Sequence, residues 1–119
     1  MNILQTTGPS NSNTRKLIRS LWKTKTGIWR RVSEILSKPS RNRPEINLYR
    51  LNKLTKENDV VVIPGKLLGA GIIDHPITVG SLMASELAVK KLTEATCTYL
   101  PIDQLMKKYK KGSNVKILV

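Results

Sequence analysis

The segment from residue 59 to 80, DVVVIPGKLLGAGIIDHPITVG, places the tightest limits on the fold. Four consecutive β-branched residues, Val60 to Ile63, lie in it between Asp59 and Pro64. Their side chains are stiff at χ1 and the run is too short for a helix, so it predicts a strand covered on both faces. Pro64 has no amide donor and is predicted to end the strand ladder. A second β-prone run at residues 77–79 predicts another strand after an intervening turn.

The glycines of this segment admit two interpretations. In the first, Gly65, Gly69 and Gly71 permit positive φ and close approach of backbone in a folded loop. In the second, their backbone and Lys66 face a phosphate group. A nucleotide-binding P-loop is excluded because Leu67, and not Ser or Thr, follows Lys66, and no upstream glycine has the required spacing. A phosphate that meets Lys66 would therefore belong to a polymer.

The charge of the chain is strongly positive and unevenly distributed. Its 119 residues contain 21 Lys and Arg against 8 Asp and Glu, which gives a net charge of +13. Residues 1–56 have a net charge of +11, residues 57–105 of −3 and residues 106–119 of +5. Self-repulsion of this size disfavours a compact monomer unless a polyanion neutralises it. Two basic ends around a near-neutral middle are the charge distribution of a nucleic-acid-binding protein.

The sequence offers little for other kinds of chemistry. Cys97 is the one cysteine and His75 the one histidine, so we expect neither a disulfide within the chain, nor a zinc site, nor any cofactor. Asp74 and His75 have no nucleophile at a recognisable spacing, and we expect a protein that is not an enzyme. Apolar runs long enough to span a bilayer and the features of a signal peptide are missing, which favours a cytoplasmic protein.

The N-terminal part of the chain predicts a basic helical hairpin. An apolar arc at Leu17, Ile18, Leu21 and Trp22 faces away from basic residues in a helix from residue 13 or 14 to about 25. Gly27 is predicted to break this helix, and a second helix runs from residue 28 to about 37. We expect both tryptophans, Trp22 and Trp29, to serve as core or staple residues rather than as base-stacking platforms.

Residues 37–45, SKPSRNRPE, form a linker that two prolines hold extended. Its basic side chains are Lys38, Arg41 and Arg43. The linker could simply be solvated, but extended backbone with regularly spaced arginines suits a phosphate chain, and we favour contact with phosphates.

The rest of the chain alternates strands and helices. Residues 46 to 48 predict a short strand, followed by a connection over residues 50–56. Ser81 can cap a helix over residues 82–92, and residues 96–100 predict a strand. Pro101 opens a last helix that ends near residue 109, and residues 115–119 close as a strand. The predicted organisation is a flexible arm (1–12), a helical hairpin with its linker (13–45) and a single α/β domain (46–119).

Several motifs together point to a family. A core with the pattern V-x-V-P-G-K-x-L-G-x-G spans residues 60–71, Thr78 and Val79 follow it, and Ser85, Ala88 and Lys91 follow in turn. Trp29 and the block ILSKPSRNRPEINLYRL lie upstream. In order and spacing these elements resemble the archaeal and eukaryotic large-subunit ribosomal protein family L-eighteen-e, related to bacterial large-subunit ribosomal protein fifteen. The resemblance covers residues 13–119, and the archaeal form is the better match. The sequence departs from it at residues 94–96, where the helix-to-strand turn is expected to hold a glycine.

The resemblance implies a mixed α/β fold of irregular strand-strand-helix turns behind a basic helical part that lies on ribosomal RNA. We therefore expect a structural, rRNA-binding constituent of the large ribosomal subunit, located in the cytoplasm and acting in translation within a ribonucleoprotein. Its expected partners are large-subunit rRNA and neighbouring ribosomal proteins, with no membrane and no homo-oligomer. The alternatives are a non-ribosomal RNA or DNA architectural protein and a small phosphate-binding enzyme that uses Lys66.

The expected rRNA contacts are Arg and Lys side chains in four places. They are Arg15, Lys16, Arg19, Lys23, Lys25, Arg30 and Arg31 on the hairpin; Lys38, Arg41 and Arg43 on the linker; Lys66 in the glycine loop; and a second patch of Lys107, Lys108, Lys110 and Lys111. The expected structural loop residues are Pro64, Gly65, Gly69 and Gly71.

Overall fold

The computed structural model describes residues 12–38, 43–112 and 114–119. Within these residues, five parallel strands form one sheet: β1 (Glu45–Asn47), β2 (Val60–Leu68), β3 (Thr78–Ala84), β4 (Thr98–Pro101) and β5 (Val115–Ile117). The order is β1, β2, β3, β4, and β5 also pairs with β2. Glu45 lies opposite Lys66 and Val115 lies opposite Val60. Since β3 occupies the other edge of β2, the short strands β1 and β5 share one edge of it.

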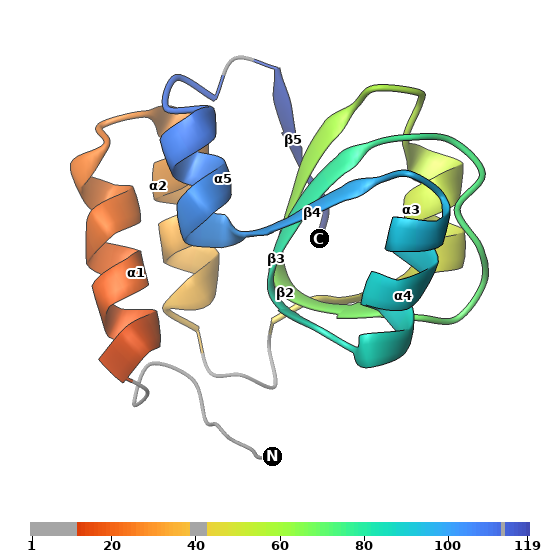
Figure 1. Ribbon diagram of the computed structural model, residues 1–119. Helices are drawn as coiled ribbons and strands as arrows, with labels where there is room; N and C mark the ends of the chain where they lie inside the picture. The colour runs from red at the N-terminus through yellow and green to blue at the C-terminus, as the bar shows by residue number, and fades with distance from the viewer. Residues whose placement is uncertain (1–11, 39–42, 113) are drawn as a thin grey trace.

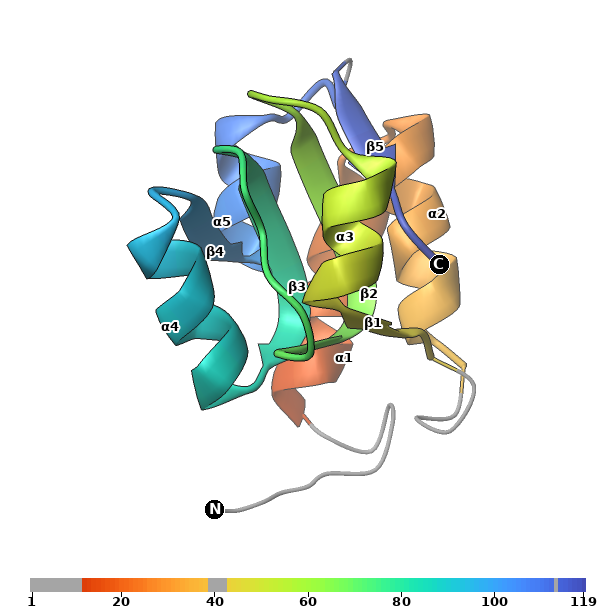
Figure 2. The same ribbon diagram turned by 90° about the vertical axis from the view of Figure 1, so that its right-hand side faces the viewer.

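The described residues also form five helices: α1 (Ser12–Lys23), α2 (Gly27–Leu36), α3 (Leu48–Leu54), α4 (Glu86–Glu94) and α5 (Ile102–Lys108). Helices α1, α2 and α5 cover one face of the sheet, and α3 and α4 cover the opposite face (Figures 1 and 2). The structure is an α/β fold with two N-terminal helices followed by alternating strands and helices, as the sequence predicts.

Strand β2 is buried on both faces, as predicted from its β-branched run. Val61 and Ile63 pack with Leu51 and Leu92 beneath α3 and α4. Val62 points the other way and packs with a cluster from α1, α2 and α5 that includes Trp29. Each face of the sheet therefore carries its own apolar core, and β2 belongs to both.

The prediction that Pro64 ends the strand ladder is wrong, because β2 continues to Leu68. The register against β3 shifts between Ile63 and Lys66. Such an irregularity lets the strand pass a residue that has no N–H to donate. Gly65 is required beside it because a Cβ at this position would overlap the carbonyl oxygen of Pro44. That same oxygen accepts a 3.0 Å hydrogen bond from the backbone N–H of Lys66.

Two other predictions of local structure also fail. The connection expected at residues 50–56 is largely helical, because α3 buries Leu48 and Leu51 against the sheet. Ser81 lies inside β3, and the cap of α4 is Ser85, whose side chain accepts from the backbone N–H of Ala88 at 3.1 Å. The predicted break between the two N-terminal helices is present, with α1 ending at Lys23 and α2 beginning at Gly27 itself. For α3 and for Ser81, contacts with the sheet decide the boundary.

The loop after β2 depends on a glycine and on a lysine from another element. Gly71 has φ of +93°, and a Cβ there would also collide with the backbone of Tyr49. Gly69 has no positive φ, but a Cβ there would collide with the side chain of Leu87. The Nζ of Lys91 in α4 donates to the carbonyl oxygens of Gly69 at 2.8 Å and of Gly71 at 2.7 Å. Lys91 therefore fastens the loop to α4.

We predict that Lys91→Met destabilises the fold by about 1 to 3 kcal/mol, because two charge-assisted hydrogen bonds to loop carbonyls are lost. Lys90→Met is the matched control, since Lys90 is its exposed neighbour on the same helix and should change stability by less than about 0.5 kcal/mol. Urea unfolding followed by circular dichroism measures both variants. Equal effects would mean that the Lys91 bonds contribute nothing.

The turn from α4 to β4 holds a threonine where the family resemblance leads us to expect glycine. Thr96 has φ of +60°, its N–H donates to Thr93 O at 3.1 Å, and Cys97 N–H donates to Leu92 O at 2.9 Å. These two bonds form a Schellman motif, in which the left-handed position is usually glycine. A β-branched residue is strained there.

We predict that Thr96→Gly raises the free energy of unfolding by about 0.5 to 1 kcal/mol, which is the relieved strain less the extra entropy that glycine loses on folding. Glu94→Gly, inside the last turn of the helix, should instead lower it by about 1 kcal/mol. Thermal and urea unfolding of the two variants distinguish a conformational effect from a general effect of glycine. A loss of stability in Thr96→Gly would contradict the prediction.

Candidate nucleic-acid interface

Helix α1 presents a basic face to solvent. Leu21 is buried against α2 and α5, whereas Arg15, Lys16, Arg19 and Lys23 are exposed. The opposition of apolar and basic faces therefore follows the sequence pattern. The helix ends in a turn in which Lys25 is exposed and has φ of +57°. Arg31 on α2 is also exposed and lies 3.5 Å from Glu34 in an exposed ion pair.

The two tryptophans have different environments, and the prediction that both serve as core or staple residues is wrong for one of them. Trp29 is fully buried, and its Nε1–H donates to the carbonyl oxygen of Tyr109 at 2.9 Å. Trp22 is 49% exposed. The guanidinium of Arg30 lies 4.3 Å from the centre of its ring, and the Nε–H of Arg30 donates to Trp22 O at 3.1 Å. Trp22 therefore belongs to the surface of the hairpin.

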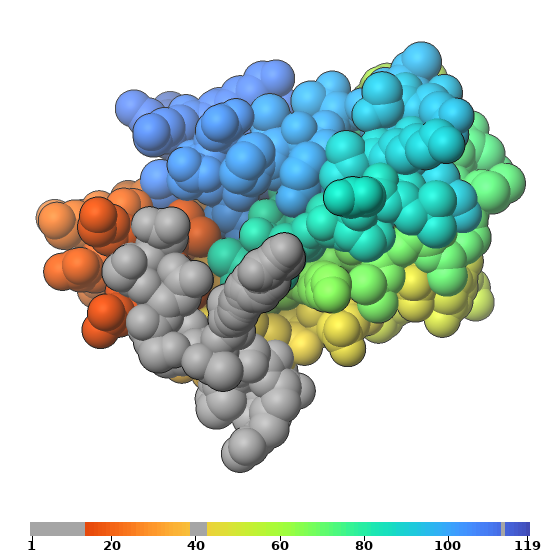
Figure 3. Space-filling view, turned by 60° about the horizontal axis from the view of Figure 1, so that its bottom comes forward, coloured from red at the N-terminus to blue at the C-terminus, as the bar shows by residue number. Residues whose placement is uncertain are grey.

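The second basic patch lies beside the first. Lys107, Lys108, Lys110 and Lys111 are all exposed. Besides the bond from Trp29 to Tyr109, the hydroxyl of Thr26 donates to Lys110 O at 3.1 Å, so the end of α5 is attached to the α1–α2 turn. Figure 3 shows α1 and α5 at the same end of the molecule. Nothing in the sequence indicates that the two patches are joined. The contact that joins them is a hydrogen bond from the buried, uncharged Trp29 to a backbone oxygen 80 residues away.

The linker residues differ in their surroundings. Lys38 is exposed, and Arg41 lies outside the described residues. Arg43 is half-buried, and its guanidinium donates to Leu36 O at 2.8 Å at the end of α2. Burial lowers the pKa of Arg43 from its usual value. This side chain has a structural bond to α2 in addition to any contact that it makes with a phosphate.

Lys66 is half-buried in β2. Its neighbour Leu67 points into the core beneath α3 and α4, so the alternation of a strand places Lys66 on the face that carries α1, α2 and α5. Among the described residues its ammonium has no hydrogen-bonding or ionic partner. Of the four groups of predicted contacts, the hairpin, Lys66 and the second patch therefore share one side of the sheet.

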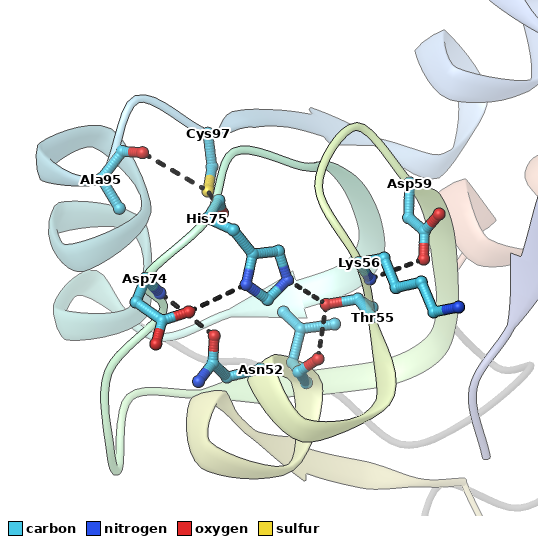
Figure 4. A network of polar contacts seen from close by, with 9 residues as sticks. Asn52, Thr55, Lys56, Asp59, Asp74, His75, Ala95 and Cys97 are labelled. Atoms are coloured by element: carbon cyan, nitrogen blue, oxygen red, sulfur yellow. Dashed lines mark hydrogen bonds and ion pairs between the residues drawn. The ribbon is translucent and has the colours of Figure 1, made fainter.

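The only histidine takes part in a structural network (Figure 4). His75 Nδ1 lies 2.9 Å from Asp74 Oδ1 and its Nε2 lies 2.7 Å from Thr55 Oγ1, while the Thr55 hydroxyl donates to Leu51 O at 2.7 Å. The hydrogen bond with His75 lowers the pKa of Asp74. Cys97 is half-buried, and its thiol donates to His75 O at 3.4 Å. Both ring nitrogens of His75 have partners, and the contact of Nε2 with Thr55 ties the loop before β3 to the end of α3.

The described residues contain no group of three His, Cys, Asp or Glu side chains that could hold a metal ion. None of the helices in the described ranges is both long and apolar enough to cross a bilayer.

Asp59 joins the start of β2 to β5. Its Oδ2 accepts from the backbone N–H of Lys56 at 2.8 Å and from Lys116 Nζ at 2.9 Å. The backbone bond and, after it, the lysine lower the pKa of Asp59 below its model-compound value of 3.8. A carboxyl with a lowered folded-state pKa adds stability above its unfolded pKa and loses this contribution as the pH falls through the folded value.

We predict that the stability difference between the wild type and Asp59→Asn is constant above about pH 5 and shrinks as the pH falls below about 4. Urea unfolding at a series of pH values measures it. Glu57→Gln, which removes an exposed carboxylate nearby, is the control and should give a small difference at every pH. A difference that stays constant down to pH 2 would contradict the assigned role of Asp59.

Together these features define a small basic α/β protein with a strongly cationic surface on the side of the sheet that carries α1, α2 and α5. No family model matches the chain. The chain is, however, 46% identical over 112 residues to large ribosomal subunit protein eL18 of Sulfurisphaera tokodaii, which covers 94% of this chain and 95% of the relative. It is 43% identical over 117 residues to the eL18 protein of Pyrobaculum aerophilum, covering 95% and 96%. A third relative, eL18 of Nanoarchaeum equitans, is 38% identical over 119 residues, covering 98% and 100%.

The chain belongs to the eL18 family of large-ribosomal-subunit proteins. These relatives come from archaea, as the resemblance in the sequence predicts. Proteins of this family are structural components of the ribosome, so the chain is not an enzyme, and the alternative of a phosphate-binding enzyme at Lys66 is wrong.

Proposed function

We propose that this protein binds large-subunit rRNA through a single basic surface formed by α1, α2 and the end of α5. The observation that carries the proposal is the attachment of α5 to the α1–α2 turn through Trp29 and Thr26. It brings basic residues that are about 80 positions apart in the sequence to one end of the molecule. The membership in the eL18 family supports ribosomal RNA as the polyanion.

The chemistry of this surface suits recognition of the phosphate backbone. Its exposed arginines can bind phosphate oxygens through two nitrogens, and its lysines act as mobile point charges. Helical RNA hides its base edges in a deep, narrow major groove, so proteins bind it mainly through shape, phosphates and 2′-hydroxyls. The protein would then neutralise phosphates where RNA helices meet and stabilise their packing, and we propose that neighbouring ribosomal proteins contact its remaining surfaces.

Non-ribosomal RNA or DNA would be bound by the same charges, and the family membership favours the ribosome. Sedimentation distinguishes the two. If the protein acts as a ribosomal component, the tagged protein should travel with the large subunit in a gradient of cell lysate and stay there after a high-salt wash.

We predict that Lys16→Ala combined with Lys107→Ala, one residue from each basic patch, weakens binding to purified large-subunit rRNA and lowers the salt slope by about 2. Filter binding at four salt concentrations gives this slope. Lys53→Ala combined with Lys90→Ala is the matched control, because these exposed lysines lie on α3 and α4 across the sheet. If both pairs lower the slope equally, binding is not confined to the proposed surface.

Arg43 is a poor choice for this test. Because its guanidinium holds Leu36 O, its loss would also disturb the end of α2 and would mix a folding effect with a binding effect.

A further inference from the structure

We infer that the groove between α1 and α2 binds an unpaired RNA base that stacks on Trp22. The inference rests on the proposed function and goes beyond it, because it adds a base pocket to a surface otherwise suited to phosphates. The groove has a volume of about 330 Å³ and is lined by Ile18 and Trp22 from the apolar side, by Arg19 and Lys23 at its basic edge, and by Glu34 from α2.

Trp22 is placed to provide the floor or wall of such a site. Nearly half of its surface is open to solvent, although a large apolar ring usually gains most from burial. Arg30 lies over the ring and is itself held to the backbone of Trp22, so the indole is supported in a fixed position. The same indole also lines the groove. A base that enters there would extend an existing stack of a guanidinium and an aromatic ring.

The charges around the groove favour a nucleotide over an apolar protein segment. Arg19 and Lys23 are exposed at its edge and suit the phosphates on either side of an inserted base. The exposed carboxylate of Glu34 can accept hydrogen bonds from the amino group of a base. Glu34 also forms an ion pair with Arg31, but this pair is exposed and 3.5 Å long, so it is weak and leaves the carboxylate able to bind a base. Glu34 thus adds one anionic acceptor beside the cations of the groove, and a base with an exocyclic amino group can donate to it.

The base must come from a loop, bulge or other unpaired position. Bases within an RNA duplex are stacked on their neighbours, whereas unpaired ones can be turned outward and stacked on aromatic side chains. The groove is a short depression between two helices, and it accommodates an extruded nucleotide rather than a helix.

The test uses the full chain and purified, protein-free large-subunit rRNA. The variant Trp22→Leu keeps an apolar side chain but removes the ring, and Trp22→Phe keeps a smaller ring. We expect Trp22→Leu to raise the Kd roughly 5- to 150-fold, the effect of losing one stacked base, without changing the salt slope. Trp22→Phe should stay within about threefold of the wild type. Circular dichroism checks that each variant is folded.

Two further measurements make the result specific. Tyr49→Leu is the matched control, because Tyr49 is 61% exposed and lies on α3, across the sheet from the groove; its Kd should not change. The chain has two tryptophans and Trp29 is fully buried, so rRNA binding should quench the emission of Trp22. This quenching should disappear in Trp22→Phe.

The outcomes separate the two proposals. If the wild type does not bind the rRNA, the proposed function fails and the base site fails with it. If the wild type binds and Trp22→Leu binds equally well, the base site is overturned while phosphate binding stands, whether or not the emission changes. A groove that serves a protein partner would give this second result. A lower salt slope in Trp22→Leu would also overturn the inference, because it would indicate lost phosphate contacts.

Discussion

The fold depends on the burial of β2 on both faces and its pairing along both edges. Val61 and Ile63 serve one apolar core and Val62 serves the other. Along its edges the strand bonds to β1, β3 and β5. Every helix of the described chain packs on one of the two cores that this strand separates. A polar residue at any of these positions would be left without a hydrogen-bonding partner in the interior, at a cost that a domain of this size tolerates poorly.

The two sides of the sheet also differ in their charge. The side that carries α1, α2 and α5 has most of the basic residues. On the side that carries α3 and α4, the basic Arg50, Lys53, Lys56, Lys90 and Lys91 are offset by the acidic Glu57, Asp74, Glu86 and Glu94. A molecule with charge divided in this way is oriented by the field of a polyanion before it makes contact. The net charge of +13 therefore understates how strongly one side is attracted and how little the other side takes part.

Sequence reasoning succeeded where a short pattern determined the structure and failed where distant contacts did. The β-branched run of β2 and the apolar faces of α1 and α2 could be recognised in the sequence, because buried residues repeat with the period of a strand or a helix. The prediction that Pro64 ends the strand was wrong because the register shifts between Ile63 and Lys66 and lets β2 continue. Beyond the proline, the backbone N–H of Lys66 bonds to the carbonyl oxygen of Pro44. Helix α3 was missed because only its packing against β2 stabilises so short a helix. The contact of Trp22 with Arg30 joins two helices at the surface, and no helical period reveals it.

The attachment of Tyr109 and Lys110 to the α1–α2 turn has a consequence for biosynthesis. During translation, the basic residues of α1 and α2 leave the ribosome about 80 residues before those of α5, and β5 follows α5. The nascent chain can then present isolated cationic helices, but it cannot present the joined surface until α5, Tyr109 and Lys110 have emerged and can bond to Trp29 and Thr26. Two stages of binding follow: loose electrostatic attraction while only α1 and α2 have emerged, and attachment through the full basic surface once α5 is in place.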